Sequence, residues 1–115
     1  MINRPRVKKA PGELFDVRIE FRNSDPNIIY VIQAISMVTI LEEITLVDKS
    51  SEMHLGVRDT IGRVNPSNPT GPRIDTDTAN VWIQGGTAGK NYLLTATVTM
   101  ESGQILSEAV LVEVR

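Results

Sequence analysis

Strict alternation of apolar and polar side chains is the sequence feature that most constrains the fold of this chain. Between residues 14 and 22, apolar and charged side chains alternate: Phe15, Val17, Ile19 and Phe21 against Asp16, Arg18, Glu20 and Arg22. Because successive side chains of a strand point to opposite faces, the pattern predicts a strand with one buried face. Residues 92–100 repeat the pattern, with one face formed by Tyr92, Leu94, Ala96, Val98 and Met100. The chain is therefore predicted to fold mainly from half-buried strands.

The C-terminal region adds further strands and a hairpin. Its inward-facing residues again occupy alternate positions: Ala79, Val81, Ile83, Val110, Val112 and Val114. Residues 101–104 include Gly103 and predict a hairpin turn, because glycine readily supplies the positive φ that such turns need. Short strands, frequent turn residues and almost no helical pattern together predict an all-β fold, a single antiparallel β-sandwich.

Residues 28–47 are strongly apolar and rich in β-branched side chains, which favour strands. We expect two strands here, at about 28–35 and 38–47, preceded by a turn at 23–27. No turn residues separate the two strands, and the apolar spacing over 40–47 also fits a short helix. Residues 36–47 therefore fit either a strand or a helix.

Two segments depart from the strand pattern. Residues 56–77 are rich in glycine and proline and predict a long loop, of a length typical of functional segments or of segments ordered by a partner. Residues 1–12 hold four of the twelve basic residues, and their two prolines exclude a helix. We expect a flexible, extended basic N-terminal arm at 1–12, either frayed or docked on an acidic neighbour, and a β-sandwich domain at 13–115. Deleting residues 1–11 should then leave the melting temperature nearly unchanged.

Tyr92 refines the predicted fold. It opens a strand after a glycine-rich corner, and Trp82 lies on the strand before it. Immunoglobulin-like sandwiches place a tyrosine at this position, with its hydroxyl bonded to backbone upstream and its ring packed in the core. We therefore expect an immunoglobulin-like sandwich; a plain core aromatic at the start of a strand is the alternative.

The sequence offers no convincing catalytic, cofactor-binding or metal-binding residue. It has no cysteine and a single histidine, His54, which we expect to be structural or solvated. Asp75 and Asp77 could share a side of an extended segment, but calcium needs six to eight oxygen ligands and no further carboxylates lie nearby, so a turn or cap is expected. Glu42 and Glu43 are adjacent, whereas glycoside cleavage needs two carboxylates across a cleft. We expect no enzyme.

Other binding classes are equally poorly supported. Residues 85–90 lack the spacing of a phosphate-binding loop and lead into a strand, where such a loop would open a helix. The net charge is −2, which gives no general attraction to nucleic acid or an anionic membrane. Tyr92 and Trp82 could stack on bases, but no basic stripe accompanies them. No apolar run is long enough to span a membrane, and residues 1–12 lack the apolar stretch of a signal peptide.

Residues 80–92 resemble a known family. They read Asn-Val-Trp-Ile-Gln-Gly-Gly-Thr-Ala-Gly-Lys-Asn-Tyr and are followed by the threonine-rich residues 95–99 and by Ser102-Gly103. This is similar to the small fiber-tail adaptor proteins of tailed bacteriophages, whose C-terminal half carries V-W-[LI]-x-G-G-T-A-G-x-x-Y, a threonine-rich strand and a glycine hairpin. The resemblance covers residues 76–115 well and 13–22 loosely, whereas residues 28–73 are longer and more apolar than the family pattern.

The resemblance implies a structural protein of the virion, located in the tail or neck and assembled in the host bacterial cytoplasm. It implies an immunoglobulin-like module, present in several copies as a homo-oligomeric ring, that joins tail or neck to fibers. It also implies partners among other virion proteins and no cofactor, small-molecule substrate, nucleic acid or membrane. Gly85, Gly86, Gly89 and Tyr92 would shape the corner turn. The alternative function is a capsid-decorating or host-surface, carbohydrate-binding β-sandwich module, although only five aromatic residues are present to supply a sugar site.

Overall fold

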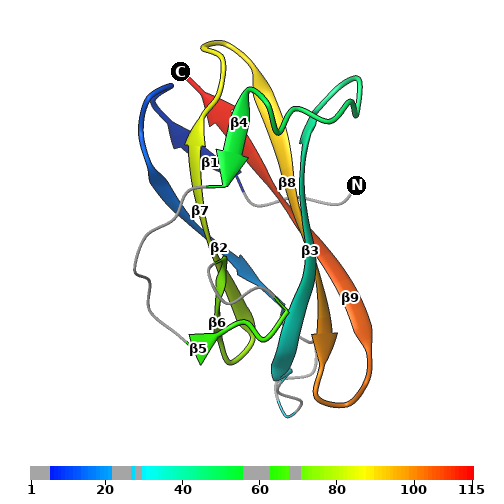
Figure 1. Ribbon diagram of the computed structural model, residues 1–115. Coiled ribbons are helices and arrows are strands. Elements are labelled where there is room, and N and C mark those ends of the chain that lie inside the picture. The colour runs from blue at the N-terminus through cyan, green and yellow to red at the C-terminus, as the bar shows by residue number, and fades with distance from the viewer. Residues whose placement is uncertain (1–5, 22–26, 28–29, 56–62, 68–70) are drawn as a thin grey trace.

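The structure is a computed structural model that describes residues 6–21, 27, 30–55, 63–67 and 71–115. These residues form two β-sheets that pack face to face (Figure 1). The strands are β1 (Arg6–Lys9), β2 (Phe15–Glu20), β3 (Ile32–Glu42), β4 (Met53–Leu55), β5 (Arg63–Val64), β6 (Arg73–Asp75), β7 (Thr78–Gly85), β8 (Asn91–Met100) and β9 (Ile105–Val114). The prediction of an all-β sandwich is confirmed.

The two sheets differ in how they are built. Sheet A has the strand order β1-β9-β8-β3, and sheet B has the order β2-β7-β6-β5, with β4 also paired to β7. All strand pairs are antiparallel except β1 with β9, which is parallel. The described residues contain no helix that is long and apolar enough to cross a membrane.

The core lies between the sheets and is built from the alternating residues. Val17 and Ile19 of β2 are 1% exposed, and all five predicted inward residues of β8 are at most 1% exposed. Val110, Val112 and Val114 of β9 are also buried. Gly103 turns the β8–β9 hairpin with a φ of 92°. Strict alternation therefore located the core strands and their facing correctly.

Strand β3 corrects the prediction of two strands at 28–35 and 38–47. Residues 32–42 form one strand, and residues 43–45 form a turn rather than a continuation or a helix. The pairing of β3 with β8 shifts register between Ile32 and Ala34 and again between Ile35 and Met37. Such bulges bend a strand without ending it, which is why no turn residues separate its two halves. Residues 28 and 29 and most of the predicted turn at 23–27 lie outside the described residues.

The segment predicted as a long loop at 56–77 contains two short strands. Strands β5 and β6 pair with each other, and β6 pairs with β7. The side-chain amide of Asn65, 1% exposed, fastens this segment to β3 by bonding both backbone groups of Ile35. Residues 56–62 and 68–70 lie outside the described residues, so the predicted loop is tested only in part.

Strand β1 corrects the prediction of a free basic arm for residues 6–9. These residues extend sheet A by pairing with residues 111–114 of β9, and Val7 packs against the core. Lys9 is 1% exposed, and its ammonium donates to the carbonyl oxygens of Ala10 at 2.6 Å and Gly85 at 2.7 Å. Burial lowers the pKa of Lys9, and the charge of Glu13 opposes this shift. A lysine can be buried when backbone carbonyls accept hydrogen bonds from its ammonium. For this reason the basic composition of residues 6–9 does not prevent them from joining the sheet. Residues 1–5 lie outside the described residues.

Candidate interaction surfaces

Tyr92 lies at the corner between β7 and β8 and makes the contacts expected of it. Its ring is buried, and its hydroxyl accepts a hydrogen bond of 2.8 Å from the backbone N–H of Thr87, upstream in the chain. Gly85 has a φ of 92°, and a Cβ on it would lie 2.7 Å from the backbone oxygen of Glu52. Glycine is therefore required where β7 passes the start of β4. The corner is a strand-to-strand turn, so residues 85–90 have no helix N-terminus with which to bind phosphate.

A cluster of charges around Glu52 ties this corner to the β3–β4 loop. Glu52 Oε1 accepts hydrogen bonds from the hydroxyls of Tyr92 at 2.8 Å and Thr87 at 3.1 Å. Lys49 Nζ lies 3.2 Å from Glu52 Oε2, and Lys90 Nζ lies 3.6 Å from Oε1. The Tyr92 hydroxyl, followed by Lys49, lowers the pKa of Glu52 from 4.5 to about 2.

This cluster predicts a loss of stability in acid. A carboxylate with a lowered folded-state pKa contributes stability that is complete above its unfolded pKa of 4.5 and is lost as the pH falls to about 2. We expect the melting temperature of the wild type to exceed that of Glu52→Gln above pH 4.5, with the difference shrinking toward pH 2. Thermal unfolding monitored by circular dichroism at pH 2–6 measures it, with the exposed Glu108→Gln as control. A difference that is independent of pH would contradict the assignment.

The outer face of sheet A is uncharged across the middle of β3, β8 and β9, and its charged side chains Arg6, Lys8 and Glu113 lie at the β1 edge. Side chains that alternate with the buried ones point away from the core, and the register places them side by side. We call this surface the threonine face: Met37, Thr39, Thr95, Thr97, Thr99, Ile105, Ser107 and Ala109. Met37 is 55% exposed and Ile105 is 70% exposed. The centres of protein interfaces are depleted in charged side chains, and the threonine face shares this property.

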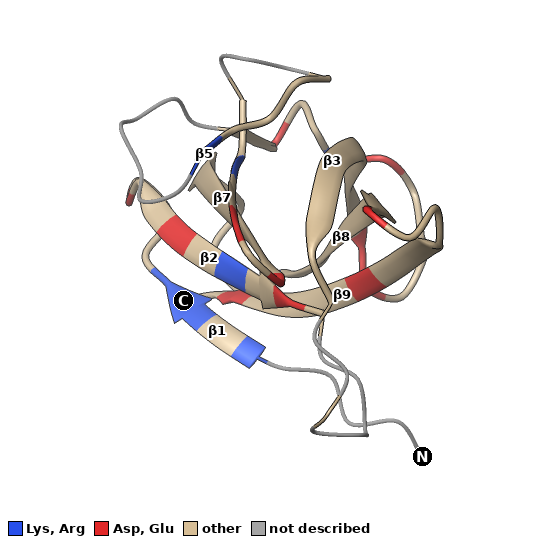
Figure 2. Ribbon diagram, turned by 90° about the horizontal axis from the view of Figure 1, so that it is seen from below, with Lys and Arg blue, Asp and Glu red and all other residues tan. Residues whose placement is uncertain are grey.

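The outer face of sheet B has the opposite character. Strand β2 places the half-buried Asp16 and the exposed Arg18 and Glu20 on this face, with alternating charge along the strand as the coloured bands in Figure 2 show. Strand β6 adds Arg73 and Asp75, which pair with Asn80 and Thr78 of β7. Trp82 lies on this face opposite Asp16, whereas Tyr92 is in the core and has no face to offer a base. We call this surface the charged face.

The acidic residues considered as sites are held in turns and strand ends. Asp75 ends β6, and Asp77 lies in the turn to β7, where it accepts a hydrogen bond of 3.0 Å from the hydroxyl of Thr78. Thr76 between them has a φ of 51°. The prediction of a turn is confirmed. Glu42 lies 3.9 Å from Lys49, and Glu43 accepts from Asn91 at 3.5 Å, so the two carboxylates have separate partners. Within the described part of the chain, no three His, Cys, Asp or Glu side chains form a metal-binding group.

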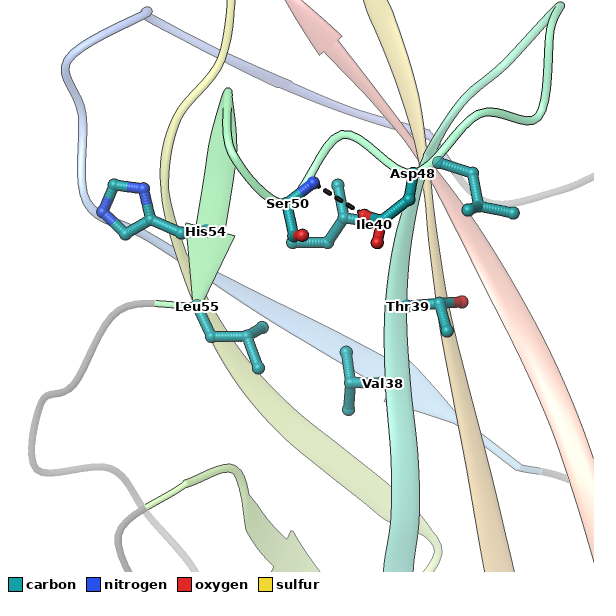
Figure 3. Close-up of a pocket in the computed structure, with 8 residues that line it drawn as sticks. Val38, Thr39, Ile40, Asp48, Ser50, His54 and Leu55 are labelled. Atoms are coloured by element: carbon teal, nitrogen blue, oxygen red, sulfur yellow. Dashed lines mark hydrogen bonds between the residues drawn. The ribbon is translucent and has the colours of Figure 1, made fainter.

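A groove that the sequence did not predict runs between β3 of sheet A and β4 of sheet B. The groove has a volume of about 380 Å³ and is lined by Val38, Ile40, Leu55, Asp48 and Ser50 among others. Figure 3 shows Val38 and Leu55 pointing toward each other across it, with Asp48 and Ser50 at one end. The ring of the exposed His54 points away, which agrees with a solvated histidine.

Comparison with known proteins agrees with this architecture. A family model described as Podophage GP4 fiber-tail adaptor protein gp77 matches residues 9–113. No curated protein matches the chain. The family match spans nearly the whole sandwich, from the buried Lys9 of β1 to β9, and it confirms the resemblance carried by the corner and the threonine-rich strand. The chain therefore belongs to the podophage GP4 fiber-tail adaptor family.

Proposed function

We propose that this adaptor works as a ring of identical copies that joins the podophage tail to its fibers by protein–protein contacts, without catalysis. The family name supports a structural role in the virion tail. In this proposal the partners are tail and fiber proteins, and no nucleic acid, membrane or small-molecule substrate takes part. The ring assembles in the host bacterial cytoplasm.

The threonine face is the observation that carries the proposal. The chain has a net charge of −2, so two copies repel each other only weakly as a whole, and local charges decide which surfaces can meet. Contact between copies costs least where no charge must be desolvated or brought near a like charge. The threonine face meets this condition, whereas the charged face of sheet B is better left in solvent. We therefore assign copy-to-copy contacts to the outer face of sheet A.

A charge placed at the centre of the threonine face tests the proposal. Thr95→Lys adds a cation between β3 and β9, where Thr95 pairs with Thr39 and Ala109. Burying an unpaired charge in an interface costs several kcal/mol, so we expect at least a tenfold loss of incorporation into tails. Incorporation is measured by quantitative mass spectrometry of particles from a complemented deletion phage, and oligomeric state by analytical ultracentrifugation.

The matched control is Gln84→Lys on the charged face. Gln84 is exposed on β7, opposite His54, and we expect its variant to assemble as the wild type does. Both variants should keep the melting temperature within a few degrees. Normal assembly of Thr95→Lys would exclude the threonine face as the contact between copies. The alternative function is a capsid-decorating or carbohydrate-binding module. The same mass spectrometry distinguishes it, because a decoration protein covers the capsid and should have far more copies per particle than a ring adaptor.

A further inference from the structure

Strand β3 is an edge strand of sheet A. The hydrogen bonds of its backbone show which of its N–H and C=O groups point toward β8 and which point away from it. The N–H of Glu42 donates to the carbonyl of Val47, and the carbonyl of Ile40 accepts from Lys49, both at 2.9 Å. These two residues therefore turn their backbone groups away from β8. The pairing of residues 38–42 with β8 has no register shift, and backbone direction alternates along a strand. Val38 must then also direct its N–H and C=O away from β8.

The chain covers this edge on both sides of Val38. Toward the start of β3, Asn65 accepts from the N–H of Ile35 at 3.1 Å and donates to its carbonyl at 2.9 Å, in the manner of a neighbouring strand. Arg63 donates to the carbonyls of Ile32 and Gln33. Toward the end of β3, the segment at 47–49 folds back onto the strand. Among the described residues, none bonds the backbone of Val38, so the edge is open at this one short stretch.

The open stretch lies beside two hollows. The groove of about 380 Å³ and a second hollow of about 220 Å³ share Val38 and Leu55 in their walls. Leu55 is 37% exposed and Met37 is 55% exposed beside them. An added strand makes backbone bonds to an open edge and places alternate side chains on one side, about 7 Å apart. Two adjoining hollows next to an open edge fit that spacing; the first is mainly apolar, and the second combines apolar walls with the polar side chains of Ser36, Asn65 and Ser67.

We propose that the β3–β4 groove binds an extended segment of a partner tail or fiber protein, with apolar side chains at alternate positions and a basic residue at the Asp48 end. The proposal rests on the proposed adaptor function and names the chemistry of its partner. The segment forms a short strand against Val38, with one apolar side chain beside Leu55 and the next in the second hollow. Edge strands attract such pairing where they are not covered.

We expect a basic residue on the partner segment because the carboxylate of Asp48 lies at the end of the groove. Asp48 Oδ1 accepts from the N–H of Ser50 at 2.9 Å, and no ion pair to Asp48 exists within the described ranges. The neighbouring Lys49 is engaged with Glu42 and Glu52. A second copy is the poorer occupant, because the described strands of this chain are already paired within its own two sheets.

Amide hydrogen exchange at Val38, compared between the isolated protein and assembled tails, tests the added strand directly. We expect fast exchange at Val38 in the isolated protein and protection by at least tenfold in tails. Leu41 lies at a position whose N–H faces β8 and should exchange slowly in both. The Leu55→Asp variant should remove the protection at Val38 and lower fiber content at least tenfold, while its melting temperature and the oligomeric state of the isolated protein stay unchanged. Asp48→Asn should lower fiber content several-fold.

The results of these experiments can overturn the added strand independently of the proposed ring assembly. Equal exchange at Val38 in the isolated protein and in tails would overturn the added strand, even if Thr95→Lys blocks ring assembly. Photo-crosslinking from benzoylphenylalanine at position 55 in tails should reach a segment of another tail or fiber protein with alternating apolar residues and a basic end. The same probe at position 84 should not. Crosslinks from position 55 only to other copies of this chain would overturn the choice of partner.

Discussion

Replacing Tyr92 with alanine is expected to lower the free energy of unfolding by about 3–5 kcal/mol. The side chain is fully buried where the β7–β8 corner, β9 and the start of β4 meet. Its removal leaves a cavity the size of a ring. It also takes away the hydrogen bonds that hold Thr87 N–H and Glu52, both of which lie at 2.8 Å from the hydroxyl. Urea denaturation monitored by tryptophan fluorescence measures the loss.

Tyr92→Phe separates the hydroxyl from the ring. This variant keeps the packing and loses only the two hydrogen bonds, so we expect a loss of about 1–2 kcal/mol. Glu101→Ala, at an exposed position in the β8–β9 turn, should change stability by less than about 0.5 kcal/mol. A loss below about 0.5 kcal/mol for Tyr92→Ala would show that the ring does not hold the corner.

The second large effect is expected at Lys9. Lys9→Ala removes three buried methylene groups and leaves the carbonyls of Ala10 and Gly85 without their ammonium donor. Together these losses should cost about 2–4 kcal/mol. The comparison is Lys8→Ala, one position away on the same strand but exposed, for which we expect less than about 0.5 kcal/mol.

Equal effects of the two lysine substitutions would mean that β1 is held by backbone pairing alone. The same reasoning reverses the expectation for deletion of residues 1–11. That deletion removes β1 and Lys9, so the melting temperature should fall clearly rather than stay nearly unchanged.

Alternation predicted the core because the same physical constraint, one buried face, acts on every residue of a central strand. Residues 15–20 and 94–100 alternate without interruption, and both lie in strands of the expected facing. The bounds of strand β3 could not be predicted from alternation. Its two bulges interrupt the alternation of inward and outward side chains, and as an edge strand it has partly exposed residues on both faces. The burial of Lys9 could not be predicted, because one carbonyl that accepts from its ammonium belongs to Gly85, 76 positions later in the sequence.

The interaction surfaces were predictable to different degrees. The threonines at 95, 97 and 99 could be assigned to an outer face from alternation alone, since the residues between them are plainly core. The groove could not be found in this way. It depends on the side-chain amide of Asn65, which bonds the backbone of Ile35 as a neighbouring strand would. It also depends on Leu55, which lies across from Val38. Such contacts join positions that carry no shared pattern along the chain.

The parallel pairing of β1 with β9 sets the order in which this protein can fold. Arg6 and Glu113, joined by an ion pair of 3.0 Å across these strands, are 107 positions apart in the sequence. Contacts between residues so far apart in the sequence form late in folding, because bringing them together costs the conformational entropy of the chain between them. Domains dominated by such contacts fold in milliseconds to seconds. During synthesis, β1 leaves the ribosome before β9, and it has no strand to join until residues 111–114 have followed. Sheet A is therefore completed at its β1 edge only after β9 has been synthesised, so a chain that ends before β9 cannot form the finished sandwich.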